Sequence, residues 1–516
     1  MKEPIREAHT FWDLIEQRAA ATPDHPFLID AADRRYSFRE IRDWAERVAA
    51  GFAAMGVREG TPVTWQLPTR IETVVASFAL SRLGAVQNPI IHIYRDREVG
   101  FCIRQTKAEL VLTAGEWRGF DYTAMVERVT ADYAAPPKIL TTYESLPEGD
   151  PATLGLAPIG ATLGDNPVRW VYYTSGTTSD PKGAQHTDQT LLAGGIGLAI
   201  ALDMSPNDVG SIAFPYAHIG GPNYIVTMLS CGFPAMLMET FVPAEAVEIY
   251  SRNGVTMAGG GPAFYTMILA EQRKNPDKKV IPSLRLLSGG GAPMPPEIYF
   301  EVQREVGVPV AHGYGMTECP MISQGGPHDT DDQLSTSEGH PVRGCMVAIV
   351  RDDGTVALPG EVGEVRVSGP MVCVGYVDPA LNATAFDSEG RFRTGDLGRL
   401  RPDGHVRLTG RLKDVIIRKG ENISAQEVED VLYAHPKVAN VAVVGLPDRD
   451  RGELVCAVVE TASGAEPLTF DEMQQWCRDA GLMTQKIPEQ LEHRDALPRN
   501  ATLKILKHQL RAELTK

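Results

Sequence analysis

The sequence lacks the features that would place the chain in a membrane or on a nucleic acid. It contains no run of about 18 apolar residues, so we expect no membrane-spanning helix. Acidic residues outnumber basic ones by 66 to 50, which gives a formal charge of −16. A nucleic-acid partner would require a basic face, and this charge argues against one. It does not exclude an anionic ligand held in a locally positive cleft.

Cysteine is also scarce. The seven cysteines are scattered singly and include no C-x-x-C pair. An odd number of isolated cysteines favours core thiols in a reducing compartment over disulfides or a zinc site. Residues 1–7 carry charges of both signs and do not resemble a secretory signal. We therefore expect a cytoplasmic location.

The length and the hydrophobic pattern predict an α/β fold with more than one domain. A chain of 516 residues is too long for one ordinary core. Before residue 335, apolar-periodic helices alternate with strand-like runs, and this alternation predicts substantially parallel sheets. The clearest elements are helices at 11–21, 37–55 and 71–83 and a strand at 62–67. Ser37 and Glu40 have the spacing of a capping box at the start of the second helix.

The pattern changes twice towards the C-terminus. Between residues 335 and 410, short strands interrupted by glycine and aspartate predict a small antiparallel or barrel-like subdomain. From residue 411 we expect a separate small α+β domain, with a helix that begins at a second capping box, Ser424 and Glu427. Its other predicted elements are strands at 415–417, 438–444 and 454–459 and helices at 470–480 and 503–514. The predicted domains are thus residues 1–410 and 411–516.

A segment rich in serine, threonine and glycine carries the first chemical signal. Residues 173–183 read Tyr-Thr-Ser-Gly-Thr-Thr-Ser-Asp-Pro-Lys-Gly. Hydroxyl groups, loop N–H groups and a fixed cation suit a polyphosphate, although this composition is also typical of a surface turn. The segment is not a Walker A loop, because no Gly-Lys-Ser/Thr closes it. The candidate phosphate-binding residues are Thr174, Ser175, Gly176, Thr177, Thr178 and Lys182.

Three further segments contain groups that suit a nucleotide. Residues 288–293 include three glycines, which would let the backbone approach a flat ring closely. Residues 313–318 read Gly-Tyr-Gly-Met-Thr-Glu and offer an aromatic face for stacking and a carboxylate suited to Mg²⁺. Asp396 is an acceptor that fits a vicinal diol. Each segment taken alone could be an ordinary turn or connector.

Taken together and in this order, the segments resemble those of the adenylate-forming superfamily. This superfamily contains acyl- and aryl-CoA synthetases, luciferases and peptide-synthetase adenylation domains, and the similarity is greatest to acyl-CoA ligases. The resemblance covers about residues 170 to 507 and includes 410–414, 418–423 and 497–506. It implies a reaction in two halves. A carboxylate attacks the α-phosphate of MgATP to give acyl-AMP and pyrophosphate; the C-terminal domain then rotates, and the thiol of coenzyme A displaces AMP.

The resemblance implies a role for each segment. Lys504 would bridge the substrate carboxylate and the α-phosphate, while Thr317 and Glu318 would serve the phosphates and Mg²⁺, with Glu318 as the metal ligand. Gly420 would lie near the thioester centre in the second half, and Lys413 would be the hinge. The residues expected to hold the nucleotide besides the phosphate loop are Gly289, Gly290, Gly291, Ala292, Tyr314, Gly315, Met316, Asp396 and Arg411.

The same resemblance places an acyl pocket around residues 214–221. His218 fits the position at which the family has an aromatic or histidine side chain that gates this pocket, although a lone histidine is more often structural. Small residues would leave volume for substrate, and residues 481–489 resemble a subgroup that handles alicyclic acids. We expect a bulky alicyclic or polycyclic acid, with an aromatic acid left open. The expected pocket residues are Tyr216, His218, Gly220, Gly221 and Gly259.

Two positions depart from the family pattern, which has glycine where this chain has Ser179 and Leu503. At Ser179, a Cβ costs about 1 kcal/mol if φ is positive, although its hydroxyl could make this change benign. Leu503 also adds a branched side chain beside Lys504, where a displacement of about 1 Å could cost about 100-fold in rate. The thioester-forming half would be spared, because it does not use this lysine in the cleft.

Several hypotheses follow from these departures. The first is a complete two-step acyl-CoA ligase. The second is a ligase specialised in the thioester half, which accepts acyl-AMP from a partner adenylating enzyme. The third is a non-catalytic adenylate-binding protein, and a minor alternative is an enzyme that loads a carrier-protein pantetheine. A homodimer is the commonest default for the oligomeric state.

Overall fold

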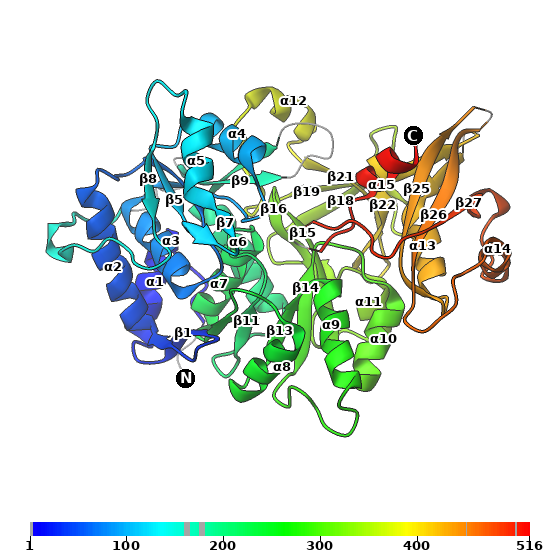
Figure 1. Ribbon diagram of the computed structural model, residues 1–516, viewed down its shortest axis with the longest axis horizontal. Coiled ribbons are helices and arrows are strands. Elements are labelled where there is room, and N and C mark those ends of the chain that lie inside the picture. The colour runs from blue at the N-terminus through cyan, green and yellow to red at the C-terminus, as the bar shows by residue number, and fades with distance from the viewer. Residues whose placement is uncertain are drawn as a thin grey trace.

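The computed structural model describes residues 4–158, 166–174, 181–419, 421–449, 451–500 and 503–515. Figure 1 shows a large body built from the first three quarters of the chain, with the C-terminal elements α13, β25, β26 and α14 gathered at one end. The α/β architecture with parallel-rich sheets is confirmed.

Two large sheets form the main body. The first has the order β17 (His340–Pro341), β16 (Cys319–Gln324), β15 (Val310–Met316), β14 (Leu286–Gly290), β13 (Met257–Gly260), β11 (Gly210–Ile212), β12 (Ala235–Leu237), β1 (Pro26–Asp30) and β2 (Arg35–Ser37). The second has the order β20 (Gly375–Tyr376), β10 (Lys182–Thr187), β9 (Val168–Thr174), β4 (Val86–Pro89), β3 (Pro62–Gln66), β5 (Leu110–Thr113) and β8 (Lys138–Thr141). Both sheets have parallel interiors, and their antiparallel strands lie at the edges.

Apolar helices fill the space between the two sheets. Helix α3 (Ile71–Leu83) contacts β1 of one sheet and β4 of the other, and α6 (Asp188–Ala201) contacts β16 and β9. Both helices are buried on nearly all sides and have no polar face, as expected for helices enclosed by sheets. The other helices of the main body are α1 (Phe11–Ala21), α2 (Phe38–Ala54), α4 (Asp96–Thr106), α5 (Tyr122–Thr130), α7 (Gly220–Cys231), α8 (Pro243–Arg252), α9 (Pro262–Arg273), α10 (Pro296–Glu305) and α11 (Asp331–Thr336), with a short hairpin β6 (Glu116–Trp117) and β7 (Phe120–Asp121).

The predicted N-terminal elements are confirmed at their ends. The Ser37 hydroxyl accepts a hydrogen bond from the Glu40 N–H, and the Glu40 carboxylate accepts one from the Ser37 N–H, so the capping box forms. Helix α3 ends at Gly84, whose φ of 66° is a conformation that glycine adopts without strain.

Two smaller sheets follow. An antiparallel sheet contains β18 (Met346–Val350), β19 (Gly363–Ser368), β21 (Phe392–Leu400) and β22 (Val406–Arg411), with α12 (Asn382–Ala385) beside it. The last sheet contains β24 (Glu421–Ser424), β23 (Val415–Arg418), β26 (Gly452–Thr461), β25 (Val438–Asp448) and β27 (Gln490–His493), and it packs with α13 (Ala425–Tyr433), α14 (Phe470–Asp479) and α15 (Lys507–Leu514).

Two predictions in the C-terminal part are wrong in detail. The last helix begins at Lys507 and not at Leu503, because Leu503 has a φ of 62° and Ile505 pairs with Arg499 in a β-bridge. At the start of α13, Ser424 accepts from the Glu427 N–H, but the capping box is only half formed. The Glu427 carboxylate binds Lys486 Nζ at 2.7 Å instead.

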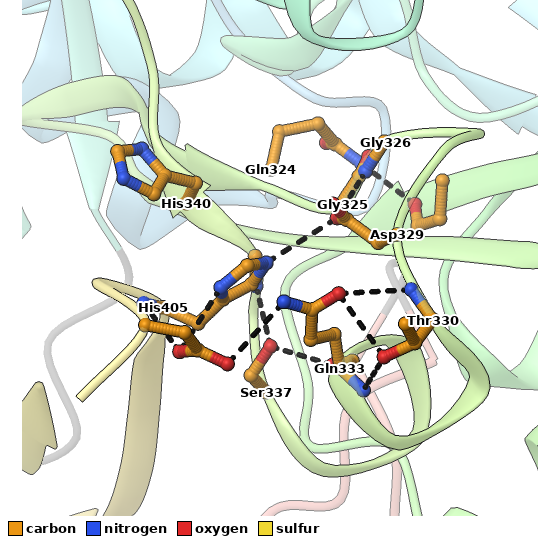
Figure 2. A network of polar contacts seen from close by, with 12 residues as sticks. Gln324, Gly325, Gly326, Asp329, Thr330, Gln333, Ser337, His340 and His405 are labelled. Atoms are coloured by element: carbon orange, nitrogen blue, oxygen red, sulfur yellow. Dashed lines mark hydrogen bonds and ion pairs between the residues drawn. The ribbon is translucent and has the colours of Figure 1, made fainter. Parts of the chain in front are cut away.

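A polar network ties the first large sheet to the turn between β21 and β22. Figure 2 shows His405 beside Gln333 and Asp329, and Gln324 beside Gly325. The His405 ring nitrogens lie 3.4 Å from Asp329 Oδ2 and 3.2 Å from Asp403 Oδ1. Gln333 also donates to Asp403 Oδ2 at 3.3 Å. These contacts hold the β21–β22 hairpin, whose strands supply four residues of the cleft described next.

Candidate functional site

A cavity of about 1150 Å³ lies where the main body meets the C-terminal unit. Its walls come from the ends of β14 and β15, from β21 and β22, and from α13 and α15. The segment before α15 extends from the C-terminal unit towards β14 and β15 (Figure 1) and adds Leu503 and Lys504 to the wall. The predicted nucleotide and catalytic residues that line it are Gly290, Gly291, Ala292, Tyr314, Gly315, Asp396, Arg411, Lys413 and Lys504.

Asp396 is the centre of a hydrogen-bonded cluster. The Tyr314 hydroxyl donates to Asp396 Oδ2 at 2.6 Å, and Arg411 Nε lies 2.9 Å from Asp396 Oδ1. Asp396 and Arg411 are opposite each other in the β21–β22 ladder, which explains why two residues 15 positions apart meet. Burial raises the pKa of the Tyr314 hydroxyl, so it stays a donor. The cluster presents an aromatic ring, a carboxylate and a guanidinium to the cavity.

The glycines of β14 serve the close approach of main chains. A Cβ at Gly290 would lie 2.3 Å from the Gly313 carbonyl oxygen, and one at Gly289 would lie 2.6 Å from the Gly260 carbonyl carbon. Gly291 has a φ of 85° and would tolerate a Cβ sterically, so its glycine is required by conformation alone. Gly315 resembles Gly290, since its Cβ would lie 2.4 Å from the Pro320 carbonyl oxygen.

His312 lines the same wall and was missed in the sequence. Its Nε2 lies 2.9 Å from the Ala292 carbonyl oxygen, which can only accept, so Nε2 carries the proton. Burial lowers the pKa of His312 to about 4, so the ring is neutral. Its Nδ1 is buried and has no hydrogen-bond partner among the residues that the structure describes. A lone histidine two positions before a tyrosine is too common to have signalled this.

Thr317 and Glu318 form the turn between β15 and β16. Glu318 is buried, and burial raises its pKa, while the Tyr376 hydroxyl donates to its Oε1 at 2.6 Å and opposes that rise. Lys182 Nζ lies 5.7 Å from the centre of the Tyr376 ring. The buried His186 donates from Nε2 to the Thr317 carbonyl oxygen at 2.8 Å. Tyr376 and His186 had no predicted role, because each acts through a residue distant in sequence.

The turn formed by Thr317 and Glu318 can hold one divalent cation only if a bound substrate supplies further metal ligands. Across the described ranges, no group of three or more histidine, cysteine, aspartate or glutamate side chains is arranged around a metal position. Glu318 offers a single carboxylate, close to the Lys182 ammonium. Mg²⁺ is commonly held in this way, by one or two carboxylates together with substrate phosphates and water.

Lys504 sits at the tip of a hairpin. The Asn500 N–H donates to the Lys504 carbonyl oxygen, and the Lys504 N–H donates to Asn500 Oδ1, both at 2.9 Å. Leu503 occupies the left-handed region, with a φ of 62°. Burial lowers the pKa of the Lys504 ammonium to about 8, Arg411 adds to the lowering, and Asp396 opposes it. The half-buried Lys504 ammonium therefore lies close enough to the Asp396 carboxylate to interact with it electrostatically.

The predicted hinge lies at the junction of the last two sheets. Gly410 has a φ of 150°, and residues 412–414 form a single 3₁₀ turn between β22 and β23. The Ser424 hydroxyl donates to the Thr409 carbonyl oxygen and so connects the two sides of this junction. Burial lowers the pKa of Lys413.

Tyr216, Gly221 and Gly259 are buried and His218 and Gly220 are half-buried, and none of these expected acyl-pocket residues lines the cavity described above. Tyr216 stacks on Trp65. The His218 Nδ1 accepts a hydrogen bond from the Gly220 N–H at 3.1 Å, so the Nε2 of His218 carries the proton. A Cβ at Gly221 would lie 2.1 Å from the Tyr216 carbonyl oxygen, and one at Gly259 would lie 2.3 Å from that of Ser288. The idea that these two glycines leave substrate volume is therefore wrong: main chain fills the space.

Part of the predicted phosphate loop lies outside the described residues. Thr174 pairs with Lys182 across β9 and β10, so the loop connects these two strands. The predicted residues that cannot be placed are Ser175, Gly176, Thr177, Thr178 and Ser179 in this loop, and Gly420 between β23 and β24.

Comparison with known proteins identifies matching families along most of the chain. The AMP-binding enzyme family matches residues 15–377, and the C-terminal domain of AMP-binding enzymes matches residues 427–504. None of the described helices is long and apolar enough to cross a membrane.

Similar proteins span nearly the full length. A 2-succinylbenzoate–CoA ligase of Bacillus licheniformis is 31% identical over 97% of this chain and 99% of its own length. A medium-chain fatty-acid–CoA ligase of Escherichia coli is 29% identical over 97% of this chain and 90% of its own length. The o-succinylbenzoate CoA synthetase of Bacillus subtilis in complex with its acyl-adenylate is similar in structure, with a TM-score of 0.83, 29% identity and coverage of 97% and 98%. A further structure of that enzyme contains ATP and magnesium.

Proposed function

The chain belongs to the AMP-binding enzyme family and is an AMP-forming acyl-CoA ligase, and we propose that the residues of its cleft divide between the two halves of that reaction. ATP, Mg²⁺ and coenzyme A are its co-substrates and cofactor, and acyl-AMP is its intermediate. The observation that carries the proposal is the position of Lys504, on the C-terminal unit, in one cavity with Tyr314 and Asp396 of the main body.

In the first half, the chain must bring two anions together. Tyr314 offers a face on which adenine can stack, and Asp396 offers acceptors for the ribose hydroxyl groups. Lys504 then lies where a cation can neutralise both the substrate carboxylate and the α-phosphate, so that a bond forms between them and pyrophosphate leaves. A fixed cation in a site that excludes water is worth several kcal/mol, about 3 for a single preorganised group. A pKa near 8 keeps most of Lys504 charged at neutral pH.

Glu318 and Lys182 would hold the phosphates in this half. Bound Mg²⁺ supplies charge neutralisation on the phosphate oxygens. Glu318 is the side chain that would carry it, and Thr317 would contribute its hydroxyl beside it. The remaining phosphate contacts are assigned to the loop between β9 and β10, which includes Thr174.

In the second half, we propose that residues 411–516 rotate about Lys413 as one domain against residues 1–410. The single 3₁₀ turn between β22 and β23 supports this division, since hinges are short segments at the ends of elements. Lys504 would leave the cleft, and Gly420 would approach the acyl carbonyl. The sulfur of coenzyme A would then bond to that carbon, and AMP would leave with the pair of electrons of the broken bond.

We propose a bulky or aromatic acid as substrate. The support comes from two relatives whose names specify 2-succinylbenzoate, an aromatic dicarboxylic acid. The His218 Nε2–H is a donor that could face such an acid, because Nδ1 is already bonded. We also propose a homodimer and a cytoplasmic location, the latter supported by seven free, buried cysteines.

A second candidate is a ligase that performs mainly the thioester half, with acyl-AMP supplied by a partner adenylating enzyme. The positive φ of Leu503, beside Lys504, favours it. The two candidates are tested with the same panel of alicyclic, aromatic and straight-chain acids. Each acid is supplied with ATP and assayed for pyrophosphate, and its synthetic adenylate is supplied with coenzyme A and assayed for thioester. Pyrophosphate release at a rate matching thioester formation supports the complete ligase, and thioester formation alone supports the second candidate. If neither product forms with any acid, both candidate functions are contradicted.

A further inference from the structure

Tyr376 contacts the two charged groups that we assign to the phosphates, Glu318 and Lys182. Its hydroxyl donates to Glu318 Oε1 at 2.6 Å, and its ring lies 5.7 Å from Lys182 Nζ. Glu318 comes from the β15–β16 turn and Lys182 from the start of β10, so the two groups belong to different sheets. One side chain therefore spans the carboxylate and the ammonium.

The position of Tyr376 is itself closely determined. It pairs with Ala184 in the β10–β20 ladder, and its N–H donates to Asn382 Oδ1 at 2.8 Å. On either side of it, the Val377 N–H donates to the Gly183 carbonyl oxygen and the Cys373 N–H to the Glu318 carbonyl oxygen. These main-chain contacts fix the backbone at Tyr376, and its ring is buried, which leaves it little room to change rotamer.

We propose that Tyr376 is a positioning residue for the metal-binding carboxylate, and that it sets the spacing between Glu318 and Lys182. This inference rests on the proposed role of Glu318. Without the Tyr376 hydroxyl, the buried Glu318 carboxylate could rotate about its own side-chain bonds. The Tyr376 hydroxyl fixes one oxygen of Glu318 and leaves the other to bind a cation. The ring face attracts the Lys182 ammonium at a distance within the range of cation–π contacts.

The two parts of this role can be separated by substitution. Tyr376→Phe keeps the ring and removes the hydroxyl, so it should weaken the cation site alone. Tyr376→Leu removes the ring as well and should also weaken the hold on the nucleotide phosphates. Loss of the partner that orients a metal ligand typically costs about 10- to 100-fold in metal affinity, and we expect about tenfold for the phenylalanine variant.

The test measures Mn²⁺ binding without turnover. The full-length protein is saturated with α,β-methylene-ATP, which cannot be cleaved at the α-phosphate, no acid is added, and free Mn²⁺ is followed by electron paramagnetic resonance. Tyr299→Phe is the matched control, because its hydroxyl donates to the Asp331 carboxylate at 2.7 Å outside the cavity. AMP binding and thermal unfolding of each variant report on the fold.

The inference predicts an Mn²⁺ dissociation constant about tenfold higher in Tyr376→Phe, with AMP affinity unchanged and Tyr299→Phe like wild type. Glu318→Gln distinguishes the positioning role of Tyr376 from the metal-binding role of Glu318. If it weakens Mn²⁺ binding while Tyr376→Phe does not, the positioning role is wrong and the role of Glu318 stands. If it has no effect, the metal role of Glu318 is wrong. An equal loss of AMP affinity in Tyr376→Phe would mark a general structural role and would also overturn the inference.

Discussion

Replacing Leu503 with glycine should speed the adenylation half of the reaction. Leu503 has a φ of 62° at the turn of the hairpin that presents Lys504, and its N–H donates to the Asn500 carbonyl oxygen at 2.9 Å. The side chain thus sits in a backbone conformation that disfavours every residue with a Cβ. The hairpin must nevertheless form for Lys504 to reach the cleft. The free-energy cost of the left-handed conformation at Leu503 therefore slows the adenylation half of the reaction.

The size of the effect follows from this conformation. A residue with a Cβ costs roughly 1–2 kcal/mol in the left-handed region. Glycine removes that cost but adds backbone freedom to the open segment, worth roughly 0.5–1 kcal/mol. The net gain for the closed hairpin is about 1 kcal/mol, which corresponds to about a fivefold higher rate of pyrophosphate release.

Leu503→Ala is the control that separates strain from bulk. Alanine keeps the Cβ and therefore the strained φ, while it removes the branched apolar side chain. We expect Leu503→Gly to raise pyrophosphate release about fivefold, Leu503→Ala to change it little, and neither to change thioester formation from synthetic acyl-AMP. Equal gains in both variants would show that side-chain bulk, and not backbone strain, limits the step. No gain in either would refute the reasoning altogether.

Two further predictions concern Asp430 of the C-terminal unit and the His405 network of the main body. Burial and the neighbouring Glu429 and Glu297 raise the pKa of Asp430 to about 7, while Arg407 and Lys507 oppose this rise. The arrangement in which the main body and the C-terminal unit are in contact therefore binds a proton. This arrangement should weaken as pH rises from about 4 to about 7. A fluorescence donor–acceptor pair on the two parts should report this opening, and Asp430→Asn should reduce its pH dependence; an unchanged dependence would contradict the assignment. His405→Ala should lower the free energy of unfolding by about 2 kcal/mol, measured in urea, because the ring packs against His340 and lies between two carboxylates; a loss below about 0.5 kcal/mol would show that the network contributes little.

Short-range signals in the sequence predicted the elements well. The capping box at Ser37 and the glycine at position 84 mark the ends of helices, and the structure places both as expected. The segments that resemble the adenylate-forming superfamily also identified Tyr314, Asp396 and Lys504, which the fold brings to one cavity. These predictions succeed because each depends on a few neighbouring residues.

What could not be predicted depends on contacts distant in sequence or on backbone conformation. Leu503 and Leu506 have the spacing of the following helix, but the Asn500 side chain bonds to the Lys504 N–H and closes a hairpin instead. Tyr376 meets Glu318 across 58 positions, and no pattern in either segment indicates the pairing. Glycines at 221 and 259 looked like space for substrate, whereas each allows two main chains to touch.

The most direct test of the central claim is Lys504→Ala assayed in both halves separately. If Lys504 serves only adenylation, pyrophosphate release from acid and ATP should fall by about 100-fold or more. Thioester formation from synthetic acyl-AMP and coenzyme A should stay within about threefold of the wild-type rate, because the lysine has left the cleft by then. Equal losses in both halves, or pyrophosphate release at the wild-type rate, would contradict the account.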